Sequence, residues 1–182
     1  MTCPAPRPRL PWRAGVGAAA ALAVAVPAYT AFAPDASAAG ALTTADGYLA
    51  EPVSPFDDGH PAITGLDPAL RDAVRKAAVE ARADGVTLVI NSGWRSRDHQ
   101  EHLLKEAVAE HGPEQARRLV NTPDRSTHVT GDAVDVGPVE ADRWLQRHGG
   151  AYGLCQIYAN EIWHFELRSQ PCPPMLPDAS AG

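Results

Sequence analysis

Two short segments of this chain alternate apolar and titratable side chains, and this alternation restricts the fold more than any other feature. In Ala133–Val136 the two valines fall on one face and Asp135 on the other. In Ile162–Leu167 the two aromatic side chains and the leucine fall on one face, and His164 and Glu166 on the other. Successive side chains of a strand point to opposite faces of the sheet. Each segment is therefore predicted to be a half-buried strand that presents titratable groups away from the core.

Signals for other helices and strands surround these two segments. Asp67-Pro68 combines a helix N-cap with proline at the first helical position, and Gly85 is expected to end that helix. The apolar run Val86–Ile90 is predicted to be a central strand. Further helices are expected from Ser96 to about Glu110, from Pro113 through Leu119 and from Pro138 to Gly149, with a polar loop over residues 121–131. This mixed order predicts an α+β domain with helices packed against a small antiparallel sheet.

The N-terminal 38 residues have the composition of an export signal. Three arginines precede an alanine- and valine-rich run over residues 14–33, which is followed by Ala36-Ser37-Ala38. This pattern predicts a signal peptide over residues 1–38 and a secreted protein. The run also approaches the roughly 20 residues of a membrane anchor. Pro27 and the small residues that follow favour cleavage, after which no stable membrane insertion is expected.

The remaining chain is long enough for one domain. Residues 39–65 are rich in Pro, Gly, Asp and Thr and are predicted to be an extended arm or linker, residues 66–176 the folded domain and residues 177–182 a C-terminal tail. Removal of residues 1–38 takes away three arginines and one aspartate, so the net charge changes from −6 to −8. An acidic domain of this kind argues against a nucleic-acid partner.

Two cysteines remain after removal of the predicted signal, Cys155 and Cys172. An even pair in an oxidising compartment is most simply a disulfide. Two buried free thiols are the alternative.

Three side chains of the second half have the chemistry of zinc ligands: His128, Asp135 and His164. Catalytic zinc takes three protein ligands and keeps a fourth position for water. A turn at Gly131 would let the loop fold back beside the strand, since glycine permits such a turn. Glu161 would be the base that acts on the water, provided that the chain bends near residues 161–162, because residues three apart on a straight strand face opposite ways.

His99 and His102 form a second histidine pair, on a predicted helix. The helical zinc-protease signature places its histidines four residues apart, so this pair does not match it. Both side chains are expected on a solvated helix face.

The motifs that carry these residues resemble a known family. S-x-H-x-x-G-x-A-x-D over Ser126–Asp135, followed by E-x-W-H over Glu161–His164, resembles the D-alanyl-D-alanine carboxypeptidases of the VanY-like zinc metallopeptidase family. S-G-W-R-S over Ser92–Ser96, with Gln100, resembles the upstream motif of that family, in which tyrosine usually stands where this chain has Trp94.

The resemblance implies a fold shared by lysostaphin-type peptidases, D-Ala-D-Ala peptidases and hedgehog domains, in which a small antiparallel sheet cradles one zinc ion. It also implies a role for each residue. The zinc ligands would be His128, Asp135 and His164; the catalytic base Glu161; the stabiliser of the oxyanion Arg95; and the substrate contacts Ser126, Gln100 and Trp163.

The activity implied is that of a secreted, cell-wall-associated D,D-carboxypeptidase. Zinc-activated water would remove the terminal D-Ala from a peptidoglycan stem peptide ending in D-Ala-D-Ala, and a monomer is expected. A peptidoglycan endopeptidase or a D,D-dipeptidase of the same fold remains an alternative. So does a non-catalytic, zinc-stabilised module that binds the cell wall. Glu161 argues against the last, because binding alone has no need of a base.

Overall fold

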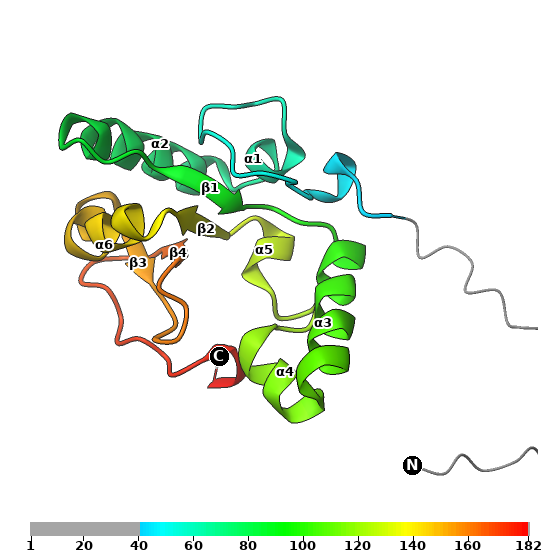
Figure 1. The fold of residues 1–182 in the computed structure, drawn as a ribbon. Helices are drawn as coiled ribbons and strands as arrows, with labels where there is room; N and C mark the ends of the chain where they lie inside the picture. Colours follow the sequence, from blue (N-terminus) through cyan, green and yellow to red (C-terminus); the bar gives the residue numbers. More distant parts are fainter. Residues whose placement is uncertain (1–40, 182) are drawn as a thin grey trace, which may run out of the picture. The chain divides into compact units, whose positions relative to one another are not determined.

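The structure is a computed structural model that describes residues 41–181, so the predicted signal peptide lies outside the described part. In that part four strands form one antiparallel sheet in the order β1-β2-β4-β3, with helices packed around it (Figure 1). The predicted α+β class is therefore confirmed. Among residues 41–181, no helix is both long and apolar enough to cross a membrane.

The strands are short and the helices vary in length. The strands are β1 (Val89–Ser92), β2 (Ala133–Gly137), β3 (Leu154–Gln156) and β4 (His164–Leu167). The α-helices are α1 (Pro61–Thr64), α2 (Pro68–Ala83), α3 (Arg97–His111), α4 (Pro113–Leu119), α5 (Thr127–Thr130) and α6 (Val139–His148). Three 3-10 turns complete the fold: η1 (Thr44–Asp46), η2 (Gly149–Tyr152) and η3 (Ala179–Ala181).

Helices α2 and α6 bury the apolar face of the sheet. Helix α2 begins as predicted, because the Asp67 carboxylate accepts hydrogen bonds from the backbone N–H groups of Ala69 and Leu70, at 2.8 and 3.2 Å. The main core joins both helices to all four strands. It includes Leu70, Val74, Ala77 and Ala81 of α2, Trp144 and Leu145 of α6, and Ile90, Val134, Val136, Leu154 and Phe165 of the sheet.

The alternation predicted for the two half-buried strands is present in β2 and β4. Val134 lies opposite Phe165 on the core face, and Asp135 lies opposite His164 on the other face. Because the two strands are neighbours, their titratable side chains meet on the face that α2 and α6 leave uncovered. This pairing positions the candidate site.

The prediction of a central strand at Val86–Ile90 is wrong. Strand β1 begins at Val89 and is the edge strand of the sheet, with β2 on one side and a single bridge to Val53 on the other. The run is apolar because the main core covers its buried side chains, including Leu88 and Ile90.

Three segments predicted without regular structure contain short helices. The loop over residues 121–131 includes α5. The arm over residues 39–65 contains η1 and α1, and its Val53 bridges to β1. The predicted C-terminal tail contains η3, and its Asp178 and Ala179 are buried. Both terminal parts of the described chain therefore pack against the rest of the domain.

Candidate metal and catalytic site

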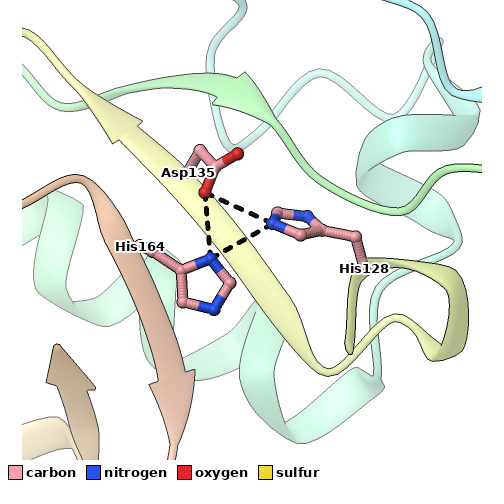
Figure 2. Close-up of side chains that lie close together, drawn as sticks. All are labelled: His128, Asp135 and His164. Atoms are coloured by element: carbon pink, nitrogen blue, oxygen red, sulfur yellow. Dashed lines mark hydrogen bonds and ion pairs between the residues drawn. The ribbon is translucent and has the colours of Figure 1, made fainter. Parts of the chain in front are cut away.

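His128, Asp135 and His164 converge at one point from three elements, α5, β2 and β4 (Figure 2). His128 Nε2 lies 3.3 Å from Asp135 Oδ1, and His164 Nδ1 lies 3.2 Å from the same oxygen. The two ring nitrogens are 3.3 Å apart. One donor atom from each residue therefore stands at a corner of a nearly equilateral triangle.

Gly131 brings His128 into this triangle. It ends α5 in the left-handed conformation, with φ of 83°, which glycine adopts without steric cost. A Cβ atom at this position would lie 2.4 Å from the carbonyl oxygen of Gly65, and the Gly131 carbonyl accepts from the N–H of Asp67 at 2.9 Å. Any other residue would push α5 away from the start of α2 and move His128 with it.

Each histidine uses one ring nitrogen for a hydrogen bond and turns the other toward the triangle. His128 Nδ1 lies 2.8 Å from the carbonyl oxygen of Gly93, which can only accept, so this nitrogen carries the proton. His164 Nε2 lies 3.1 Å from the carboxylate of Glu166. Outer hydrogen bonds of this kind fix the tautomer and the ring orientation of metal-binding histidines.

Glu166 has a role that the sequence analysis did not assign. It is fully buried, and it accepts hydrogen bonds from Thr127 Oγ1 at 2.9 Å and from the Arg168 guanidinium as well as from His164. The signal was present in the sequence. A glutamate two residues after a candidate ligand on the same strand lies on the same face and can reach the far side of its ring.

The electrostatics favour a cation at the centre of the triangle. Burial acts to raise the pKa of Asp135, but the charges and hydrogen bonds of His128 and His164 hold it well below its usual range. Burial acts to lower the pKa of His164, yet hydrogen bonds to Asp135 and Glu166 raise it to about 9. Burial, reinforced by the charge of Arg95, lowers the pKa of His128. The carboxylates thus stabilise positive charge at His164, where a divalent cation could replace the proton.

The triangle has the size that zinc requires. Zinc binds histidine nitrogen and carboxylate oxygen at about 2.0–2.2 Å in tetrahedral geometry, so two ligand atoms stand about 3.3 Å apart. The three observed separations are 3.2, 3.3 and 3.3 Å. The donor set, two imidazoles and a carboxylate, also suits zinc.

Glu161 approaches the triangle from the turn before β4. The N–H of His164 donates to the carbonyl of Glu161 at 3.2 Å, which is the bend expected near residues 161–162. This turn places a carboxylate oxygen of Glu161 3.8 Å from His164 Nδ1. Burial raises the pKa of Glu161 to about 7; the charge of Asp135 also raises it, while His164 and Arg95 act in the opposite direction.

Arg95 is buried beside the triangle and linked to the predicted substrate contacts. Its guanidinium donates to Asp135 Oδ2 at 3.2 Å, to Ser92 Oγ at 3.0 Å and to Gln100 Oε1 at 3.3 Å. Ser126 Oγ donates to the same oxygen of Gln100 at 3.0 Å. Ser126 and Gln100 therefore hold each other and Arg95, and all three line the cavity described next.

A cavity of about 230 Å³ opens beside the triangle. Its walls include Glu161, Arg95 and the three converging side chains, and also Tyr158, Asn121 and Ala179. Trp163 was predicted to share the buried face of β4 with Phe165. Instead it lies in the turn before the strand, 42% exposed at the cavity wall. That turn, which Glu161 needs, removes Trp163 from the strand alternation.

The second histidine pair is split between two environments. His102 is partly exposed and lies 3.2 Å from Glu106, as expected for a solvated helix face. His99 is buried, and its Nδ1 lies 3.1 Å from the carbonyl oxygen of Asp46. The solvated face predicted for His99 is therefore wrong, because the arm that contains η1 covers this part of α3.

The comparisons with known proteins agree with this geometry. The profile of the family described as VanY, D-alanyl-D-alanine carboxypeptidase, matches residues 64–169, which include every side chain of the triangle as well as Glu161 and Arg95. This chain belongs to the VanY family. The VanY-family chain is also 30% identical over 111 residues to a D-alanyl-D-alanine carboxypeptidase of Enterococcus faecalis, a match that covers 47% of this chain. It spans about two fifths of the length of that relative, 41%.

Two solved structures resemble the VanY-family chain over more than half of its length. One is a vancomycin-resistance D,D-pentapeptidase VanY variant in complex with Zn(II), with a TM-score of 0.54 and 26% identity. The alignment covers 57% of this chain and 73% of that one. The other is VanYB in complex with D-alanine-D-alanine, with a TM-score of 0.55 and 25% identity over 57% of this chain and 72% of the other.

Proposed function

We propose that this protein is a secreted, zinc-dependent D,D-carboxypeptidase that removes the terminal D-Ala from peptidoglycan stem peptides ending in D-Ala-D-Ala. The observation that carries the proposal is the triangle of His128, Asp135 and His164, with tetrahedral spacing and a carboxylate of raised pKa beside it. Family membership and the complexes of similar proteins with Zn(II) and with D-Ala-D-Ala support it. The disulfide between Cys155 and Cys172 supports an oxidising compartment.

His128, Asp135 and His164 would hold the zinc ion. When bound, zinc would supply a Lewis acid that polarises the scissile carbonyl and acidifies a water molecule. The hydrogen bonds to Gly93 and Glu166 keep the other nitrogens of both imidazoles directed at the centre of the triangle. The resulting rigidity is what a catalytic site needs to hold its ligands in one geometry.

Glu161 would act as both base and acid. A carboxyl with a pKa near 7 can take a proton from the attacking water and return it to the leaving amine as the C–N bond breaks. Arg95 would donate to the carbonyl oxygen as negative charge develops there. Its Nε is buried and has no hydrogen-bond partner within residues 41–181, which leaves a donor for an incoming group.

The proposal is tested by mass spectrometry of a muramyl pentapeptide ending in D-Ala-D-Ala. We expect loss of one D-alanine, abolished by zinc chelation and reduced at least about 100-fold by Glu161→Gln, in the range of a lost general base. Glu51→Gln, at an exposed position, is the matched control. Loss of the dipeptide, an internal cut, or hydrolysis that persists in Glu161→Gln with zinc still bound would each contradict the assignment.

A further inference from the structure

The C-terminal part of the described chain reaches the wall of the catalytic cavity, where Ala179 lies. Residues 172–181, here called the C-terminal strap, run from the β3 side of the sheet to α4 (Figure 1). The family profile ends at residue 169, so the strap lies outside the part of the chain that the family shares. Its contacts are therefore described from this chain alone.

Three kinds of bond anchor the C-terminal strap. At its start Cys172 is bonded to Cys155 of β3. In its middle Leu176 forms a parallel bridge, donating to the carbonyl of Ile157 and accepting from the N–H of Ala159, both at 2.8 Å. These anchors join the strap to the segment that leads from β3 to Glu161.

The end of the strap is anchored to α4. The buried carboxylate of Asp178 accepts from Arg118 Nε at 2.8 Å, and its other oxygen accepts from the N–H of Ser180 at 3.0 Å. Asn160 Nδ2 donates to the Arg118 carbonyl at 3.4 Å, so α4, the strap and the turn before Glu161 form one connected wall.

The anchored end separates two cavities. Ala179, only 2% exposed, lines the catalytic cavity of about 230 Å³. Its neighbour Ser180 lines a second cavity of about 430 Å³ between α3, α4 and the loop after α4. Val120 and Asn121 border both cavities. Ala179 and Ser180 of η3 therefore stand between the two spaces, beside the shared Val120 and Asn121.

We propose that the C-terminal strap is a specificity-determining wall, which confines the catalytic cavity and so restricts this protein to free ends of peptides. The inference rests on the proposed function for the choice of peptide. In this proposal the terminal residue of the peptide lies against Ala179, and a chain that continued beyond it would meet the strap. Arg118 and Asp178 act as positioning residues, because the bond between α4 and the strap that they form holds Ala179 in place, while neither side chain lines the cavity.

The test compares a peptide ending in D-Ala-D-Ala with the same peptide extended by one further residue. The quantity is the ratio of kcat/KM for the free-ended peptide to that for the extended one. Arg118→Ala releases the strap end, and a chain ended at Pro177 removes Ala179 altogether. We expect both changes to lower the ratio at least about tenfold, because kcat/KM for the extended peptide should rise. Gln115→Ala is the control, an exposed side chain on the same helix, and should stay within about twofold of the parent.

Binding to zinc-loaded Glu161→Gln protein separates this inference from the proposed function. The same two peptides are titrated by calorimetry with and without the strap changes, and the ratio of their Kd values is compared. If the parent hydrolyses neither peptide, the proposed function fails, while the Kd ratio still decides the role of the strap. An unchanged ratio in the folded chain ended at Pro177 would overturn the inference.

Discussion

Replacement of Glu166 by glutamine should weaken zinc binding without unfolding the protein. Glu166 accepts hydrogen bonds from His164, Thr127 and Arg168 on a carboxylate that is completely buried. Glutamine keeps the shape and one acceptor for His164, but it removes the charge that makes the imidazole a stronger ligand. Loss of such an outer partner typically lowers metal affinity 10- to 100-fold. This corresponds to about 1.4–2.7 kcal/mol of binding free energy.

The assay is a competition between the protein and a chelating dye for zinc at pH 7, with the melting temperature of the metal-free protein measured in parallel. Glu140→Gln, on the exposed face of α6, is the control for a change of charge alone. If the zinc affinity of a folded Glu166→Gln protein stayed within about twofold of the parent, the hydrogen bond between His164 and Glu166 would not orient the ligand, and the reasoning would be refuted.

Three further predictions concern stability. Asp142 is buried with one carboxylate oxygen unpartnered within residues 41–181, and burial raises its pKa to about 6. Since the unfolded pKa is about 4, its contribution to stability is fully present below pH 4 and is lost as the pH rises through 6. Asp142→Asn should therefore stabilise the protein by up to about 3 kcal/mol at pH 7.5 and hardly at pH 4, as measured by urea unfolding at both values; an equal gain at both would contradict this. Reduction of the Cys155–Cys172 disulfide, which joins residues 17 apart, should lower the free energy of unfolding by about 3 kcal/mol. Alkylation verifies that both thiols are free, and an unchanged urea midpoint of unfolding would contradict the prediction. Phe165→Ala empties the centre of the core and should cost about 3–5 kcal/mol in the same assay, and a loss below 1 kcal/mol would show that the core collapses around the gap.

Local signals in the sequence predicted most of the helices. Ser96 caps α3 by accepting from the N–H of His99 at 3.1 Å, and Gly112, with φ of 81°, separates α3 from α4 at the predicted place. These features depend on residues within one turn of each other, so the sequence carries them directly. The alternation in β2 and β4 was equally local and placed Asp135 and His164 on the face opposite the core.

Features that depend on distant parts of the chain were missed or wrong. Strand β3 is only three residues long, which is too short for an alternating pattern that would predict a strand. The outer side of β1 is bridged by Val53, and the burial of His99 depends on Asp46, both in a segment whose composition is that of a linker. Ala179 lies in a predicted tail, yet the bond between Asp178 and Arg118 holds it at the cavity. Such contacts are set by tertiary packing, which composition and periodicity do not encode.

The pairing of Asp135 with His164 also determines when the site can form during folding. The two residues are 29 positions apart, and only the backbone ladder between β2 and β4 brings them together. The entropy cost of closing a loop of this length precedes the stabilisation that the contact provides. We therefore expect the ligand triangle to form late in folding, with the other non-local contacts. A zinc ion held by this triangle would bind molecules in which β2 and β4 are already paired. We therefore expect zinc uptake after dilution from denaturant to lag behind helix formation.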